Sequence, residues 1–144
     1  MELPGRVLAI DWGEARIGLA ISDPTRTLAT PRAALEEKDK GRQISRVVAL
    51  IAELEVTGVV VGMPLHMDGS ATRSTVPAMK YAEKLARLAG VPVTLVDERL
   101  TSIEAEERLT EAGRRPGRAD KGRIDSAAAA IMLQRWLDAS KGAT

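Results

Sequence analysis

The sequence predicts an α/β domain in which a five-stranded mixed sheet carries helices on its faces. Two strand-like runs near the N-terminus are separated only by residues 12–15, as in an antiparallel hairpin. Farther along, segments with helical periodicity alternate with short apolar runs. Because a helical crossover brings the next strand back parallel, the two later strands should be parallel to each other and to the first strand.

The predicted strands are short apolar runs, at residues 7–10, 17–21, 28–35, 58–62 and 91–96. Pro31 lies within the third run, and proline cannot donate a hydrogen bond to a neighbouring strand. We therefore expect the third strand at an edge of the sheet.

Four helices are predicted, at about residues 41–55, 75–89, 101–113 and 121–139. Gly90 provides a C-terminal cap for the second helix, and Thr101 to Glu104 form a capping box that opens the third. The last helix is apolar nearly all round between Ala127 and Leu133. A helix of that kind is buried or packed on two sides.

The composition predicts a single domain over residues 1–144 with an aliphatic core, because aromatic residues make up only 2% of the chain and phenylalanine is absent. The same scarcity argues against RRM and OB domains, which stack bases on aromatic side chains. Without cysteine, disulfides and thiolate metal sites are excluded. The N-terminus lacks the pattern of a signal peptide and no apolar run is long enough to span a bilayer, so we expect a cytoplasmic protein without a membrane partner.

Ligands of a sheet of this kind tend to gather beyond the carboxyl ends of its parallel strands. Two acidic residues should lie there, and the last helix could bring a third. Asp11 follows the first strand, Glu98 follows the fifth, and Asp125 lies in the first turn of the last helix. Clustered carboxylates repel one another, and hard cations such as Mg²⁺ or Mn²⁺ prefer oxygen ligands. These cations activate water and stabilise the leaving oxygen of a phosphodiester.

Each acid also has a purely structural interpretation. Asp11 could begin the hairpin turn, Glu98 could be a solvated strand end, and Asp125 could favour the positive end of its helix dipole. Position alone leaves these alternatives open.

Four sequence blocks resemble the YqgF (RuvX-type) family and occur in the family's order over nearly the whole chain: AIDWGEARIGLAISDP (9–24), VVGMPLHMDGS (60–70), VDERLTS (96–102) and KGRIDSAAA (121–129). Members of this family are RNase H-like proteins, described as Holliday junction resolvases and as nucleases that mature ribosomal RNA precursor. The resemblance implies an RNase H-like fold and a divalent-metal-dependent hydrolase. Its catalytic and metal-binding acids match Asp11, Glu98 and Asp125, with Mg²⁺ or Mn²⁺ as the cofactor.

Asp97 is the nearest competitor of Glu98, because strand alternation points the two side chains to opposite faces. The family pattern selects Glu98. The implied substrate is RNA precursor, at the 5′ end of pre-16S rRNA, with ribosomal particles as a further partner. The alternative is branched DNA in Holliday junction resolution. A resolvase normally acts as a two-fold dimer, whereas an RNA-trimming enzyme need not, so monomer and homodimer both stay open.

Contacts to nucleic acid must come from local clusters of charge, because the net charge of the chain is only +1. One cluster leads directly to Asp125, and single arginines lie near the other motifs. The candidates are Arg114, Arg115, Arg118, Lys121 and Arg123, together with Arg16, Arg73 and Arg99. For Arg16 a solvated place in the hairpin is favoured over a phosphate contact, and His66 is expected to be an exposed loop residue. Gly13 and Gly18 should allow a tight turn or a close backbone approach.

Two other functions compete with a nuclease. ATP-dependent phosphotransferases of the actin and sugar-kinase type share this ancestral fold, but they pair two such domains and this chain holds one. A non-catalytic RNA-binding factor in ribosome assembly would keep the basic cluster and tolerate loss of the acids.

Overall fold

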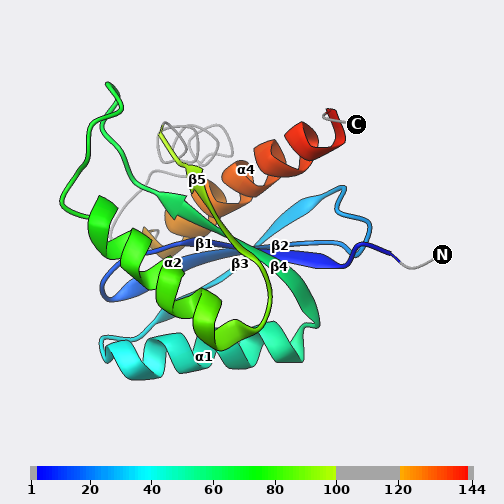
Figure 1. The fold of residues 1–144 in the computed structure, drawn as a ribbon, viewed down its shortest axis with the longest axis horizontal. Helices are drawn as coiled ribbons and strands as arrows, with labels where there is room; N and C mark the ends of the chain where they lie inside the picture. Colours follow the sequence, from blue (N-terminus) through cyan, green and yellow to red (C-terminus); the bar gives the residue numbers. More distant parts are fainter. Residues whose placement is uncertain (1–2, 100–120, 143–144) are drawn as a thin grey trace.

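The computed structural model describes residues 3–99 and 121–142. Five strands form one sheet in the order β3-β2-β1-β4-β5, with helices on both faces (Figure 1). The strands are β1 (Arg6–Asp11), β2 (Arg16–Ser22), β3 (Ala29–Glu36), β4 (Val56–Met63) and β5 (Val93–Asp97). The helices are α1 (Lys40–Glu53), α2 (Thr75–Ala89) and α4 (Lys121–Gly142).

The pairing of the strands confirms the predicted mixed sheet. β1 pairs antiparallel with β2 and parallel with β4, and β4 pairs parallel with β5. β3 pairs antiparallel with β2 at the edge of the sheet, as Pro31 predicts. β5 begins at Val93 rather than Val91 because Pro92 has no N–H to donate; only its carbonyl joins β4, accepting from Val59 at 2.9 Å. The predicted helix at 101–113 lies outside the described residues.

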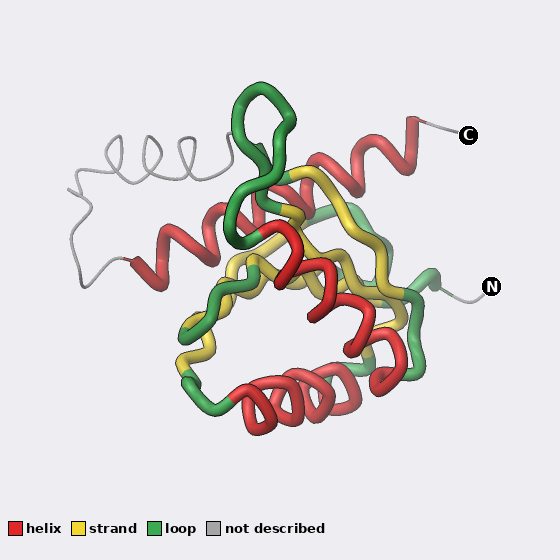
Figure 2. Tube along the Cα trace, turned by 60° about the vertical axis from the view of Figure 1, so that its left-hand side comes forward, coloured by secondary structure: helices red, strands yellow, loops and turns green. Residues whose placement is uncertain are grey.

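Alternation along the strands separates two layers of core. Leu8 and Ile10 of β1 lie in the cluster that includes α1 and α2, whereas Val7 and Ala9 lie in the cluster that includes α4. Figure 2 shows the same arrangement, with α4 on the opposite side of the sheet from α1 and α2. The sequence prediction that the last helix is buried is confirmed, since Ala129 and Leu133 are fully buried. None of the helices in residues 3–99 and 121–142 has the length and apolar character needed to cross a membrane.

Small residues of β2 let the first turns of α4 approach the sheet closely. A Cβ atom added at Gly18 would overlap the backbone carbonyl group of Asp125. The buried Ser126 hydroxyl accepts a hydrogen bond from the Leu19 N–H at 3.2 Å, which fixes the helix against the strand at this point. Farther along α4, Gln134 bonds to the N–H of Ala29 and to the carbonyl of Thr27, both at 2.9 Å. The packing of α4 is therefore set by specific contacts as well as by apolar burial.

We expect Gly18→Ala to lower the free energy of unfolding by about 1–3 kcal/mol, because the new methyl group must displace the first turns of α4. Chemical denaturation measures the loss. Gly58→Ala is the matched control, since Gly58 is also a strand glycine and the closest atom to a Cβ there would be the flexible end of Arg26, at 3.4 Å. Equal stability of the two variants would contradict the proposed close packing.

Candidate active site

The three predicted acids come from distant parts of the chain and lie on the α4 side of the sheet. Asp11 ends β1 on the same face as Val7 and Ala9, whose side chains pack against α4. Glu98 directly follows β5, and Asp125 lies on α4 itself. Because β1, β4 and β5 run parallel, their carboxyl ends bring Asp11 and Glu98 to one edge of the sheet.

The carboxyl groups of Asp11 and Glu98 lie close enough to share a hydrogen bond when one of them is protonated. Gly62 of β4 makes this approach possible, because a Cβ atom there would overlap the Glu98 carboxyl group. Sequence reasoning missed the role of Gly62. Its signal was a glycine inside an otherwise valine-rich strand, which often marks a place where another group comes close.

Asp125 is held by Arg16, whose Nε lies 2.7 Å from Asp125 Oδ2. Both side chains are about one-third exposed, at 30% for Arg16 and 29% for Asp125. The expectation that Arg16 is merely a solvated hairpin residue is therefore wrong, because α4 brings a carboxylate from 109 residues away in sequence. Arg16 orients Asp125 and supplies a positive charge beside the acids.

Two of the three acids, Asp11 and Asp125, open onto a cavity of about 260 Å³. Asp11, Asp125 and Arg16 line it together with the hairpin residues 12–15. The two predicted glycines have different structural roles here. Gly13 makes the turn tight, since a Cβ there would overlap the carbonyl oxygen of Arg16, whereas Gly18 admits the helix.

Burial raises the pKa of the Asp11 carboxyl group well above its ordinary value. The nearby negative charges of Glu98 and Asp125 raise the pKa of Asp11 further, and the charge of Arg16 lowers it. Burial also raises the pKa of Glu98, although its hydrogen bond with Asp11 works in the opposite direction. The site thus favours a proton, or another cation, between these two carboxyl groups.

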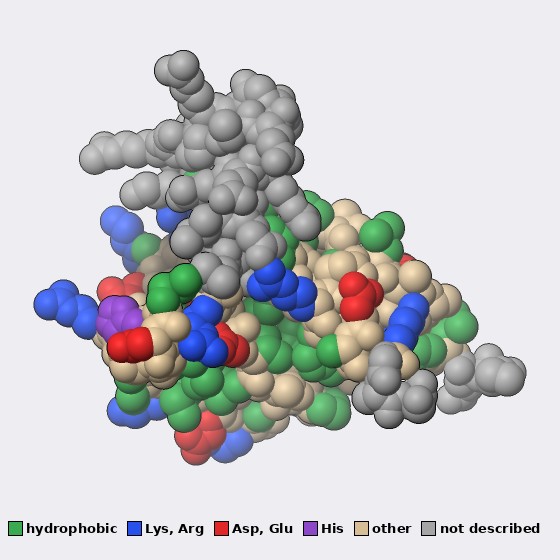
Figure 3. All heavy atoms as spheres, turned by 90° about the horizontal axis from the view of Figure 1, so that it is seen from above, with side chains coloured by type: hydrophobic (Ala, Val, Ile, Leu, Met, Phe, Trp, Pro, Cys, Tyr) green, Lys and Arg blue, Asp and Glu red, His purple; other side chains and the backbone are tan. Residues whose placement is uncertain are grey.

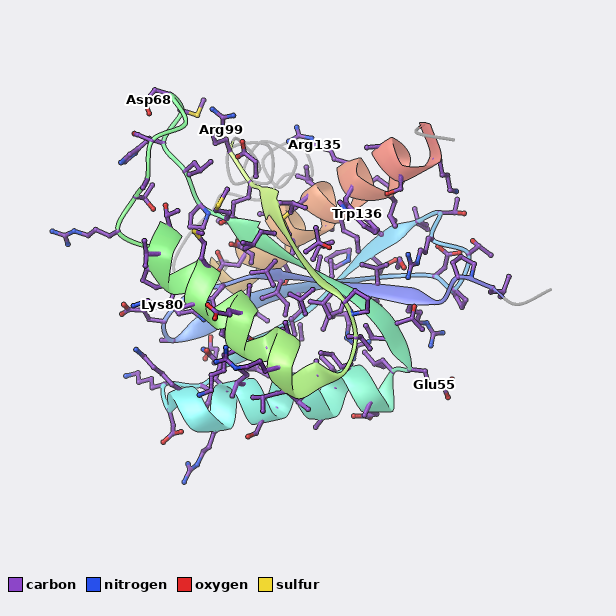
Figure 4. The ribbon with its side chains drawn as sticks, viewed as in Figure 1. Glu55, Asp68, Lys80, Arg99, Arg135 and Trp136 are labelled. Atoms are coloured by element: carbon purple, nitrogen blue, oxygen red, sulfur yellow. The ribbon has the colours of Figure 1, made fainter. Side chains whose placement is uncertain are left out.

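Asp97 is separated from this cluster although it is adjacent to Glu98. Its carboxylate accepts from Arg99 Nε at 2.8 Å and from the Arg99 backbone N–H at 2.9 Å. These bonds hold the pKa of Asp97 below its ordinary value. Arg99 in turn donates to the carbonyl of Met67 at 3.1 Å, which ties the end of β5 to the loop that follows β4. Figure 4 shows Arg99 next to this loop, which also carries Asp68.

The donor chemistry of the site fits a hard divalent cation. Asp11 and Glu98 offer carboxylate oxygens, and Mg²⁺ is commonly held by one or two carboxylates together with substrate phosphate. Within residues 3–99 and 121–142, no three acidic or histidine side chains enclose a cation by themselves. Asp125 is engaged with Arg16 and lines the same cavity as Asp11.

The other predicted nucleic-acid contacts are more scattered. Arg73 lies in the loop before α2, and His66 is exposed in the same loop, as expected. The histidine is visible on the surface in Figure 3. Arg114, Arg115 and Arg118 lie outside the described residues. The backbone of Lys121 and Arg123 belongs to the first turn of α4.

We expect Asp11→Asn to stabilise the metal-free protein increasingly as the pH rises. The pKa values of Asp11 and Glu98 are higher in the folded chain, so their protonation favours folding at pH values below about 4. That stability is lost as the pH rises through the raised folded pKa values, whereas an uncharged asparagine side chain at this position does not titrate. Melting temperatures of both proteins in chelator, from acidic to neutral pH, measure the difference. A difference that does not vary with pH would contradict the electrostatic account.

Comparison with known proteins identifies relatives that share most of the chain. A family model described as RuvX, Holliday junction resolvase, matches residues 5–139. A protein of Anaeromyxobacter sp. (strain Fw109-5), described as "Putative pre-16S rRNA nuclease", is 46% identical over 133 residues, covering 92% of this chain and 96% of the relative. A protein of Roseiflexus sp. (strain RS-1) with the same description is 39% identical over 138 residues, covering 96% of this chain and 97% of the relative.

Solved structures with low sequence identity share the fold. RuvC of T. thermophilus, in complex with a Holliday junction substrate, gives a TM-score of 0.60 at 18% identity over 95% of this chain and 96% of that chain. The fowlpox virus resolvase with Holliday junction DNA gives a TM-score of 0.56 at 10% identity, over 94% of this chain and 98% of that chain. Both agree with the RNase H-like fold that the sequence predicts. From the family match over residues 5–139 and the identities of 39% and 46% to its relatives, the chain belongs to the RuvX family.

Proposed function

We propose that this protein is a divalent-metal-dependent nuclease that hydrolyses phosphodiester bonds in the maturation of ribosomal RNA precursor. The observation that carries the proposal is the pair of adjacent carboxyl groups, Asp11 and Glu98, beside a cavity that Asp11, Asp125 and Arg16 line. The descriptions of the relatives support the choice of pre-16S rRNA as the substrate.

Asp11 and Glu98 would hold Mg²⁺ or Mn²⁺, with Asp125 completing the site from α4. When bound, such a cation neutralises the phosphodiester and lowers the pKa of bound water. The chain's own contribution is to place the carboxylates. β1 and β5, which flank β4 in the sheet, fix Asp11 and Glu98 at its carboxyl edge, and Arg16 holds Asp125 at 2.7 Å. Catalysis then depends on keeping these oxygens oriented toward the cavity.

We expect Asp11→Asn to reduce cleavage at least ~100-fold, about 2.7 kcal/mol in activation free energy, because a neutral amide is a poor cation ligand. Folding and nucleic-acid binding should persist, since the variant relieves repulsion among buried acids. Initial rates with Mg²⁺, with Mn²⁺ and in chelator measure the effect, and chelator should abolish wild-type cleavage.

Asp97→Asn is the matched control for this variant. It removes the carboxylate next to Glu98 at the end of β5, which pairs with Arg99 instead of facing Asp11. An exposed ion pair of this kind contributes only about 0–1 kcal/mol to the free energy of unfolding. Its cleavage rate should stay close to that of the wild type. Unchanged cleavage by Asp11→Asn would refute the catalytic assignment and favour a non-catalytic RNA-binding factor.

A second candidate function is resolution of Holliday junctions, which the description of the matching family and the likeness to RuvC favour. A cleavage panel separates the two functions: single-stranded RNA, single-stranded DNA and four-way DNA junctions, each with Mg²⁺ and with Mn²⁺. We expect single-stranded RNA to be cleaved fastest. Preferential and symmetric cleavage of the junctions by a dimer would favour the resolvase instead.

A further inference from the structure

A second cavity lies on the other side of the sheet, between α1 and α2, with a volume of about 370 Å³. We call it the α1–α2 groove and define it by Trp12, Val76, Tyr81, Lys40, Lys80 and Lys84. Figure 4 labels Lys80 on α2, in the part of that helix that faces the beginning of α1. Lys80 and Lys84 are four residues apart and therefore share one face of the helix.

The groove adjoins the acidic cavity at the β1–β2 hairpin, which contributes lining residues to both. Trp12 immediately follows Asp11, and both Trp12 and Glu14 line the two cavities. Strand alternation explains the connection: Asp11 faces α4, whereas Trp12 packs against the core beneath α1 and α2. A flexible chain bound at Asp11 can therefore continue around the end of β1 into the groove.

The groove combines an apolar wall with unpaired positive charge. The rings of Trp12 and Tyr81 lie with centroids 6.0 Å apart, and Val76 beside them is 52% exposed. Lys40, Lys80 and Lys84 are exposed, and none of them forms an ion pair with a described residue. Glu14 is the only acid among the lining residues. This combination suits an anion that also carries a flat apolar group.

The aromatic wall also contains two polar atoms that packing alone does not explain. Trp12 Nε1 and the Tyr81 hydroxyl are buried, and neither has a hydrogen-bond partner among the described residues. Buried polar atoms are normally paired, and leaving them unpaired costs free energy. Phenylalanine would fill the space at position 81 without that cost, so apolar packing alone does not account for the hydroxyl group of Tyr81.

We propose that the α1–α2 groove binds an unpaired nucleotide of the substrate strand, with its base against Trp12 and Tyr81 and neighbouring phosphates at the three lysines. A cavity of this volume holds a ligand the size of a nucleotide but not a duplex. Aromatic stacking together with a basic track is the usual way in which proteins hold single strands without reading their sequence. The inference rests on the proposed nuclease function, because it extends the path of the same substrate.

Tryptophan fluorescence reports on the groove directly. The chain has two tryptophans, and Trp136 lies on α4 on the opposite face, so Trp136→Phe leaves Trp12 as the only tryptophan emitter. The probes are oligouridine and oligothymidine of about ten nucleotides and a blunt duplex of equal length, in chelator so that no cleavage occurs. We expect either single strand to quench Trp12 at saturation and the duplex to leave its emission nearly unchanged. An unquenched Trp12 at saturation, or equal quenching by the duplex, would overturn the proposal.

Charge removal tests the lysines in the same assay. Lys40→Ala/Lys80→Ala/Lys84→Ala should weaken single-strand binding at least about tenfold and reduce the slope of log affinity against log salt by about 2, since each phosphate contact on a single strand contributes about 0.7. The control is Arg32→Ala/Arg46→Ala/Arg87→Ala, which removes three exposed charges outside both cavities. Melting temperatures verify that both triple variants fold.

The outcomes separate this inference from the proposed nuclease function. Equal affinity and equal salt slope for the two triple variants would refute nucleotide binding in the groove, even if Asp11→Asn abolishes cleavage. Conversely, binding is measured without a cation, so a groove-dependent loss of affinity would support the inference even if cleavage proved independent of Asp11.

Discussion

The close approach of α4 to β2 at Gly18 is the contact on which the candidate site depends. In the β1–β2 ladder Gly18 is the partner of Asp11, and the absence of its Cβ lets the Asp125 backbone lie directly against the strand. The same glycine therefore lies between two of the three acids. Gly62 has an equivalent role for Glu98 on the other side of β1. The absence of a Cβ atom at Gly18 and at Gly62 therefore sets how closely the three carboxyl groups can approach one another.

This compact arrangement has an electrostatic cost. Burial and mutual repulsion raise the pKa values of Asp11 and Glu98, and one guanidinium group, Arg16, offsets part of the negative charge. A fold selected for stability alone would not place these groups together, because clustered buried charges destabilise the native state. A site that must bind a divalent cation gains affinity from the same repulsion. The destabilisation and the proposed activity thus have one physical origin.

The β1–β2 hairpin lies between the acidic cavity and the α1–α2 groove. Its residues line the acidic cavity on the α4 side, and Trp12 and Glu14 also line the α1–α2 groove. Since Gly13 keeps the turn tight, Asp11 and Trp12 have little freedom relative to each other. A substrate held on Trp12 would consequently be positioned with respect to the acids by the backbone itself. A hairpin of this kind can couple binding of the nucleic-acid strand to placement of the phosphodiester without a conformational change.

The sequence by itself determined the order of the described elements, the mixed sheet, the edge position of β3 and the identity of the three candidate acids. These follow from local periodicity, proline chemistry and short motifs, which depend only on nearby residues. The tertiary structure alone decided that Arg16 pairs with Asp125 across 109 residues, that Gly62 makes room for Glu98, and that three lysines and two aromatic side chains line one cavity. Those features arise where separate elements pack, and the distance between packed side chains is not encoded in the spacing of either segment.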